Sequence, residues 1–281
     1  MAKVKIVTDS TAYLPPELIT RYGIEVVPLK VLFGPEAYTE GVDISNEEFY
    51  RKLAKASTLP TTSQPSIGDF VQVYDKAARE AAPILSIHIS SKLSATVNSA
   101  LNAKDELPQA QIEVVDSLSG CMGLGMIVLA AARAAEEGQA LSQIRASIER
   151  LIKGMHLFFL VDTLEYLHKG GRIGGAATLL GTALRIKPIL CVKDGQIEAL
   201  ARVRTKRKAV ARMLELVEER VQRGAAVHVA VFHAQAADEA LALQEEIRAR
   251  FDCAEMHLSD LGPVIGTHVG PRAVGLAFYT D

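Results

Sequence analysis

The sequence has no tryptophan, and aromatic side chains make up only 5% of its 281 residues. Its hydrophobic fraction is nevertheless 49%, so the apolar side chains are mostly aliphatic. A chain of this length and composition can form one large or two medium domains with real cores. The aliphatic excess suits a large core or a flexible apolar cavity equally well.

Cysteine and net charge are scarce too. Cys121, Cys191 and Cys253 are scattered and form no CxxC pair, which predicts buried thiols in a reducing compartment and not disulfides or a zinc site. The formal net charge of -2 gives no bulk attraction to nucleic acid or to an anionic membrane. The histidines show no metal-ligand spacing. We therefore expect no metal, no cofactor and no nucleic-acid partner.

Long apolar runs are missing as well. None reaches the roughly 20 residues of a membrane helix. Met1 leads into an expected strand without the features of a signal peptide. We expect a soluble, cytoplasmic protein without a transmembrane segment.

The first half of the chain alternates expected strands and helices. Pro16 and the capping signals at Ser45 and Ser66 mark helix starts. Strands are expected at 4–8, 24–33, 84–89, 112–116 and 156–161, the last closing this half. Repeated strand–helix units favour a three-layer, mainly parallel sheet. We predict an α/β domain over 1–160.

The second half has a different pattern. Asp194-Gly195 lies between the apolar runs 189–192 and 197–203, which is a strong hairpin signal. A helix at 205–221, a strand at 227–232, a helix at 238–250 and strands at 255–258 and 273–279 follow. We predict an α+β domain over 161–281, with a ligand cleft between the two domains.

Three hydroxyl-rich stretches form the strongest candidate site. They are 61–66, 90–96 and 266–271, and the first two are expected to open helices. Hydroxyls and free backbone N–H groups at such turns can hold an anion. Thr62, Ser63 and Ser94 would bind it, with His268 as a further donor. Alternatively, Thr62 and Ser94 only cap helices.

A catalytic interpretation uses the same residues. Ser94 and His268 could act in an acyl hydrolase or transferase, but a Ser–His pair needs a group that orients the imidazole. Asp260 lies eight residues before His268, and the sequence does not place its carboxylate. No GxSxG elbow, Walker A motif or dinucleotide fingerprint is present.

Six segments, in order along nearly the whole chain, resemble the DegV family. They are TDST at 8–11, TSQPS at 62–66, SKLSAT at 91–96, YLHKGGRIG at 166–174, KPIL at 187–190 and IGTHVGP at 265–271. The resemblance implies a two-domain α/β fold with a long-chain fatty acid buried between the domains. It implies that Thr62, Ser94 and His268 bind the carboxylate, with Ser63 and Thr96 in the same two turns.

The resemblance also implies a partner. Family members have no turnover of their own and present the bound acid to a separate ATP-dependent fatty-acid kinase, which makes an acyl-phosphate for phospholipid synthesis. It assigns docking of that partner to Arg172 and Arg202. These arginines and the nearby Arg204 could instead belong to a solvated, salt-paired face.

Three positions depart from the family pattern. Ala95 replaces a usual glycine, so the turn after Ser94 needs ordinary backbone angles. Val269 replaces a common threonine and removes a hydroxyl beside His268. Arg272 replaces a frequent glycine, and it could pair with the carboxylate, gate access or face water.

Overall fold

The computed structural model describes residues 3–80, 82–181, 186–222 and 224–280. Its N-terminal part is built on a sheet of four strands that all run parallel. In spatial order these strands are β2 (Glu25–Val27), β1 (Lys5–Asp9), β6 (Ile84–His88) and β7 (Ile112–Asp116). The central strand β6 is buried at every position, as expected when helices cover both faces of a parallel sheet.

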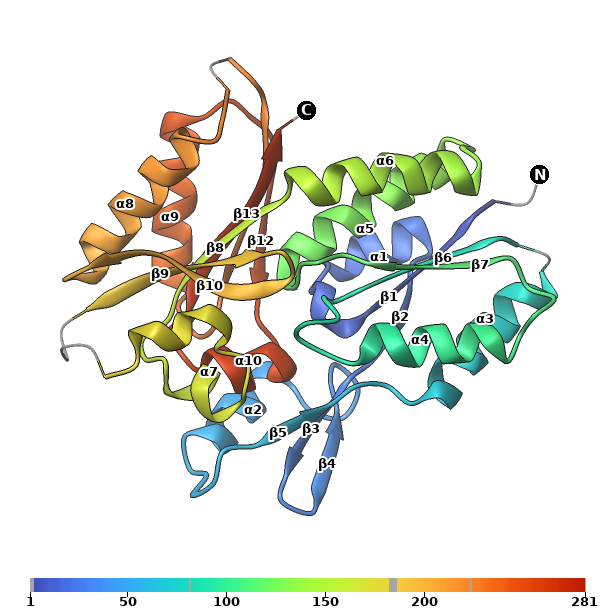
Figure 1. The fold of residues 1–281 in the computed structure, drawn as a ribbon, viewed down its shortest axis with the longest axis horizontal. Helices are drawn as coiled ribbons and strands as arrows, with labels where there is room; N and C mark the ends of the chain where they lie inside the picture. Colours follow the sequence, from blue (N-terminus) through green and yellow to red (C-terminus); the bar gives the residue numbers. More distant parts are fainter. Residues whose placement is uncertain (1–2, 81, 182–185, 223, 281) are drawn as a thin grey trace.

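Helices lie on both faces of this sheet, so the expected three-layer α/β arrangement is confirmed (Figure 1). One face packs against α3 (Ile67–Arg79) and α4 (Thr96–Asp105). The other packs against α5 (Cys121–Glu136) and α6 (Leu141–Gly154), and α1 (Pro16–Tyr22) packs on α5. A complete capping box starts α3, because Ser66 and Asp69 each bind the other's backbone N–H.

The C-terminal part is built on a mixed sheet of six strands. In spatial order they are β10 (Gln196–Val203), β9 (Lys187–Lys193), β8 (His156–Leu160), β13 (Val274–Thr280), β11 (Val227–His233) and β12 (Cys253–Asp260). Only the β11–β12 pair is parallel. The expected hairpin is confirmed: Asp194 and Gly195 join β9 to β10 with φ of 49° and 82°, as a type I′ turn requires.

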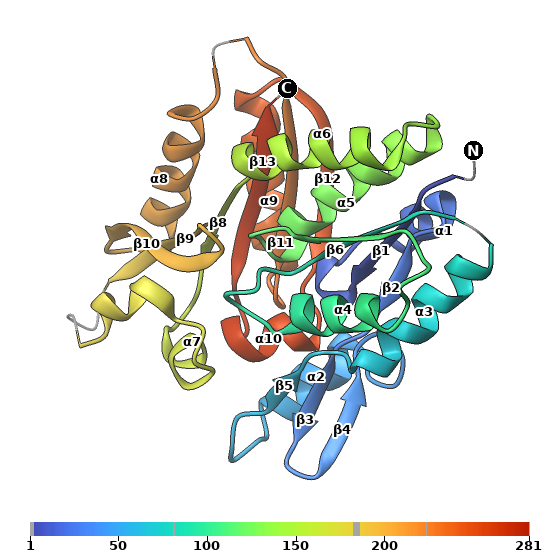
Figure 2. The same cartoon turned by 45° about the vertical axis from the view of Figure 1, so that its right-hand side comes forward.

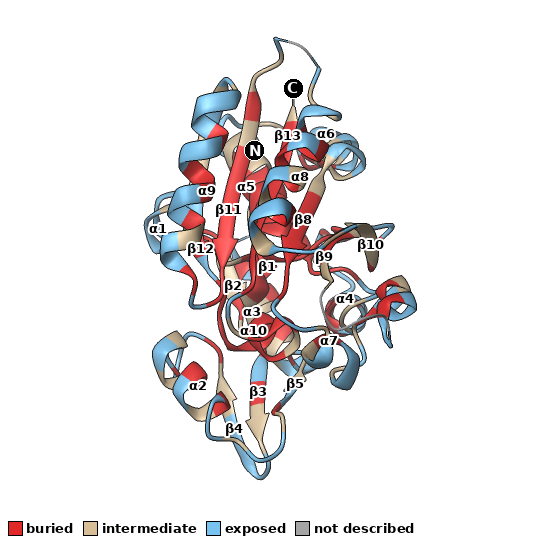
Figure 3. Cartoon of the chain, turned by 90° about the vertical axis from the view of Figure 1, so that its left-hand side faces the viewer, coloured by how far each residue is buried: buried red, intermediate tan, exposed pale blue. Residues whose placement is uncertain are grey.

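Helices α8 (Lys206–Glu218) and α9 (Ala237–Arg250) cover the outer face of this sheet, with their exposed sides toward solvent (Figure 3). Helices α5 and α6 cover the inner face, so α5 packs on both large sheets. The strand at 156–161 does not close the first half as expected. It is β8, which pairs with β9 and β13 in the second sheet. The domain boundary at residue 160 stays a prediction.

A small antiparallel sheet lies below the two large ones (Figure 2). It contains β4 (Glu36–Thr39), β3 (Lys30–Phe33) and β5 (Thr61–Ser63), and α2 (Asn46–Leu53) follows β4 in the chain. The expected single strand at 24–33 was wrong, because it breaks at Pro28 into β2 and β3 of different sheets. The stretch 61–66 opens α3 only through Ser66, because Thr62 and Ser63 lie in β5; the stretch 90–96 leads into α4 as expected.

Helix α10 (Pro263–Val269) packs against this small sheet, against α2 and against α7 (Glu165–Lys169). Two 3₁₀ turns, Ser10–Ala12 and Gly174–Leu179, complete the described elements. None of the described helices combines the length and the hydropathy that a membrane span requires. All three cysteines are free thiols, two of them buried.

Candidate functional site

A cavity lies between the two large sheets, next to α10. Its atom-free space is about 810 Å³ including the part open to solvent, and the centre of a water molecule can reach about 70 Å³ of it. It is therefore a narrow passage. Most of the lining side chains are apolar, among them Ile89, Leu157, Phe159, Phe232, Leu261 and Val264. The polar ones are Thr62, Gln64, Ser94, Arg172 and His268.

Two of the three hydroxyl-rich stretches meet directly in this cavity. Strand β5 carries Thr62 beside β3, and the last turn of α10 carries His268. Thr62 Oγ1 lies 2.9 Å from His268 Nε2. The other ring nitrogen, Nδ1, is buried and has no hydrogen-bond partner among the described residues. It packs against Gly170, where a Cβ would lie only 2.4 Å away, so only glycine fits there.

His268 is neutral at neutral pH. Burial lowers its pKa to about 4, and the nearby positive charge of Arg172 acts in the same direction. A neutral imidazole donates from one nitrogen and accepts at the other. His268 can therefore hydrogen-bond an anionic group, but it supplies no positive charge to it.

The third stretch contributes Ser94 to the same cavity. Ser94 Oγ lies 2.9 Å from Thr96 Oγ1, and the Thr96 N–H points to it at 3.4 Å. Ala95 has φ -79° and ψ 13°, so the expected ordinary backbone at this position is confirmed. Thr96 itself is fully buried behind Ser94 and does not line the cavity.

Ser63 faces a different space. It lines a polar groove with Ser66 and Asn98, and its hydroxyl donates to the Gln64 carbonyl at 3.1 Å. Gln64 lines both this groove and the cavity. The sequence did not single out Gln64, although it lies inside the first hydroxyl-rich stretch.

The two arginines assigned to docking lie in different environments. Arg172 lines the cavity and bridges two turns, since its Nε donates to the Leu93 carbonyl at 3.1 Å and its Nη1 to the Gly170 carbonyl at 2.8 Å. Arg202 is exposed on β10 and forms no ion pair within the described part of the chain. Arg172 thus has a structural contact beside the cavity, while Arg202 is open to solvent.

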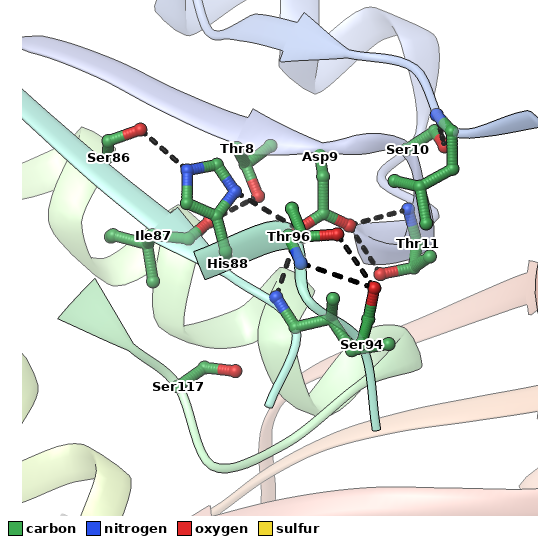
Figure 4. A network of polar contacts seen from close by, with 12 residues as sticks. Thr8, Asp9, Ser10, Thr11, Ser86, Ile87, His88, Ser94, Thr96 and Ser117 are labelled. Carbon is green, nitrogen blue, oxygen red and sulfur yellow. Dashed lines mark hydrogen bonds and ion pairs between the residues drawn. The ribbon is translucent and has the colours of Figure 1, made fainter. Parts of the chain in front are cut away.

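A buried polar network lies behind the Ser94 turn (Figure 4). Asp9 Oδ2 accepts from the Ile89 N–H at 2.9 Å and lies 3.1 Å from His88 Nδ1. Ser86 Oγ lies 2.6 Å from His88 Nε2 and accepts from the Tyr74 hydroxyl at 2.7 Å. The order Asp–His–Ser is that of a hydrolase triad, but these three side chains are fully buried and line no part of the cavity. The network instead holds the end of β6, from which the Ser94 turn starts.

The Ser94–His268 hydrolase lacks the geometry that it needs. His268 Nε2 contacts Thr62 and not Ser94. Asp260 lies 3.3 Å from His233 Nδ1 and accepts from Asn46, so it does not orient His268. Within the described ranges, no group of three metal-ligating side chains is present either.

Arg272 faces away from the cavity, which agrees with the solvent-facing alternative. Its side chain is 61% exposed and lies 3.4 Å from Glu239 of α9. Its φ is 63°, in the left-handed region that glycine adopts more readily than arginine.

Sequence reasoning missed two further residues near the site. Cys121 begins α5 and lines the cavity, and burial raises the pKa of its thiol to about 12. Glu40 is buried at the start of α10 with no basic partner among the described residues. Neither residue has a sequence signal. No motif surrounds either one, and a single sequence does not show which glutamates or cysteines are buried beside a site.

Known proteins resemble this chain over its whole length. The family model described as "Uncharacterised protein, DegV family" matches residues 3–281. A DegV domain-containing protein of Halalkalibacterium halodurans is 42% identical over 282 residues, covering 100% of each chain. A solved structure described as showing fatty acid binding of a DegV family protein from Thermus thermophilus is 39% identical, with a TM-score of 0.95 over 99% of this chain and 100% of its own. DegV from Bacillus subtilis, described as a fatty acid binding protein, is 35% identical with a TM-score of 0.91, and 100% of both chains is covered.

Proposed function

Since this chain belongs to the DegV family, we propose that it binds a long-chain fatty acid in the cavity between its two large sheets. The observation that carries the proposal is the lining of that cavity, which among the described residues is apolar apart from a polar group formed by Thr62, Ser94, His268 and two neighbours. The fatty acid binding described for the structures from Thermus thermophilus and Bacillus subtilis supports it.

The acyl chain supplies most of the affinity. Burying roughly 14 methylenes at ~0.8 kcal/mol each gives a gross gain near ~11 kcal/mol, before the costs of association and ordering. The carboxylate is held by Thr62, Ser94 and His268, while Ser63 on β5 and Thr96 at the start of α4 lie beside Thr62 and Ser94 without lining the cavity. These are neutral donors, which bind an anion less strongly than a bidentate arginine.

Weak binding of the carboxylate suits a protein that presents the bound acid to another protein. We propose that the protein acts without turnover of its own and presents the carboxylate to a separate ATP-dependent kinase in the cytoplasm. The kinase makes the acyl-phosphate that phospholipid synthesis consumes. Neutral donors leave one carboxylate oxygen free to attack the γ-phosphoryl group of ATP, with ADP as the leaving group. The partner docks at Arg172 and Arg202.

Lipid analysis of the purified protein tests the binding proposal. Denaturing extraction followed by mass spectrometry should recover a long-chain fatty acid in near-stoichiometric amount. A protein that carries no lipid and takes up no added fatty acid would contradict it. Ser94→Ala and His268→Ala should each weaken binding without abolishing it. Complete loss in both would show that the head group, and not the tail, dominates.

Turnover tests the carrier role separately. The purified protein should leave acyl esters intact, and ATP consumption should require the protein, a fatty-acid kinase and fatty acid together. Ester hydrolysis by the protein alone, abolished by Ser94→Ala, would overturn the carrier role in favour of an enzyme.

A further inference from the structure

Glu40 is a buried carboxylate whose contacts join three parts of the chain. Its side chain accepts from Ser10 Oγ, from the Tyr13 hydroxyl at 2.8 Å and from the Val264 N–H at 2.8 Å. Ser10 and Tyr13 belong to the turn after β1, Glu40 follows β4, and Val264 lies in α10. Only 5% of Glu40 is exposed, and no described basic side chain pairs with it.

These contacts attach the first turn of α10 to the N-terminal part of the chain. Glu40 Oε1 binds the Val264 N–H, and the Tyr13 hydroxyl that donates to Glu40 accepts from the Ile265 N–H at 3.1 Å. Gly262 makes this approach possible, because a Cβ there would lie 2.6 Å from Glu40 Oε1. Two successive amides at the start of the helix are thereby fixed.

The same helix carries the head-group histidine. His268 lies four residues after Val264, one helical turn further on the same face, and both side chains line the cavity. A displacement of the first turn of this seven-residue helix is therefore passed on to His268, whose Nε2 lies 2.9 Å from Thr62 Oγ1.

We propose that Glu40 is a positioning residue for the head-group site, whose charged carboxylate anchors α10 and so holds His268 against Thr62. This role rests on the proposed binding of a fatty-acid carboxylate by His268. A carboxylate accepts more strongly than a neutral acid, so protonation of Glu40 loosens the anchor. Fatty-acid affinity then falls when Glu40 becomes neutral.

The titration of Glu40 falls in an accessible range. Burial raises its pKa to about 6, against the hydrogen bonds from Ser10, Val264 and Tyr13, which lower it. Asp9, Tyr13, Tyr50 and Cys121 are the other titratable groups that face it. Burial raises the pKa values of Tyr13, Tyr50 and Cys121, so these three stay uncharged at neutral pH and below.

Three variants test the role. Glu40→Gln has no titrating group. Its amide oxygen can still accept from Val264 and Tyr13, because its NH₂ can face a reoriented Ser10 hydroxyl. Glu40→Ala removes the anchor. Glu255→Gln is the matched control, since Glu255 of β12 binds Arg133 of α5 and so also links the two parts of the chain, away from α10.

Calorimetric titration of the lipid-free proteins with palmitic acid, from about pH 5 to about pH 8, gives the readout. We expect Glu40→Ala to bind about tenfold more weakly at pH 8 and Glu40→Gln within about threefold of the parent. Below about pH 6, the affinity of the parent should fall relative to that of Glu40→Gln. His268 and the ligand titrate in both proteins, so the difference between the two profiles reports on Glu40. Glu255→Gln should keep the parent affinity and profile.

Three results would overturn the proposal: parent-like affinity in a folded Glu40→Ala, a Glu40→Gln profile identical to that of the parent, or an equal loss in Glu255→Gln. A measurement without ligand separates failure of the positioning role from failure of the proposed function. It records the imidazole ¹⁵N signals of the lipid-free protein, in which His268 is assigned by comparison with His268→Gln. They should shift in Glu40→Ala and not in Glu255→Gln, even if palmitic acid does not bind to the parent. Unshifted signals in Glu40→Ala would exclude positioning.

Discussion

Thr62 Oγ1 lies 2.9 Å from His268 Nε2, although 206 residues separate the two in the chain. The contact joins the edge of the small sheet to the last turn of α10 and places a hydroxyl and a neutral imidazole at the polar part of an apolar passage. The imidazole is uncharged at neutral pH, because burial disfavours its protonated form.

Acid should therefore destabilise the protein through His268. Its pKa is about 4 in the folded chain and about 6.5 in the unfolded chain, so only the unfolded state takes up a proton between these values. Stability falls as the pH falls through this window, by up to roughly 3 kcal/mol. The difference in free energy of unfolding between the parent and His268→Gln, from denaturant titrations, should shrink accordingly toward pH 4. Glu40 is present in both proteins and cancels. A difference that is independent of pH would contradict the assignment.

Truncation of the Ile89 side chain should widen the passage. Ile89→Ala removes a cavity-lining side chain, and Ile87→Ala removes the same side chain from a buried position outside the cavity. Both should lower the free energy of unfolding of the lipid-free protein by about 2–5 kcal/mol. Only Ile89→Ala should improve the binding of methyl-branched acids relative to straight ones, as measured by competition against a fluorescent fatty acid. The same change of preference in Ile87→Ala would argue against the passage as the acyl site.

Two buried serines should differ in their contribution to stability. Ser86→Ala leaves the Tyr74 hydroxyl and His88 Nε2 without partners, which should cost about 1–3 kcal/mol for each group. Ser119 Oγ has no partner within the described residues, so Ser119→Ala should stay within about 1 kcal/mol of the parent. Guanidinium unfolding followed by circular dichroism measures both. Equal losses of unfolding free energy in the two variants would show that the hydrogen bonds of Ser86 add nothing to stability.

Charge reversal at Arg202 should separate docking from lipid binding. Arg202 is exposed and is not among the residues that line the cavity, so Arg202→Glu should leave fatty-acid affinity unchanged and lower the rate of acyl-phosphate formation with the kinase about tenfold. Arg150→Glu on α6 is the matched exposed control and should change neither quantity. Loss of lipid binding in Arg202→Glu would refute docking there. Arg172 is a poorer probe, because its contacts to Leu93 and Gly170 would also be lost.

Local signals in the sequence predicted local structure well. Asp194-Gly195 fixed the β9–β10 hairpin, because few other residue pairs accept positive φ at both positions. Ser66 and Asp69 marked the start of α3 through bonds that span only three residues. The apolar run at 84–89 predicted a strand, which forms as β6 and is buried at every position.

Errors arose where a pairing partner lay far away. Thr62 and Ser63 belong to a three-residue strand, which is too short to show periodicity and forms only because β3 accepts it. Strand β8 follows the first-half elements in the chain, but hydrogen bonds with β13 draw it into the second sheet.

By itself, the sequence determined the alternation of elements, the aliphatic character of the interior and the residue types of a weak anion site, since these depend on composition and near neighbours. It also carried the motifs that resemble the DegV family. Only the tertiary structure decided which hydroxyls meet. It placed Thr62 against His268, left Ser63 in a separate groove and buried Glu40 beneath α10. Those choices depend on long-range packing, whose contacts join residues that no local pattern relates.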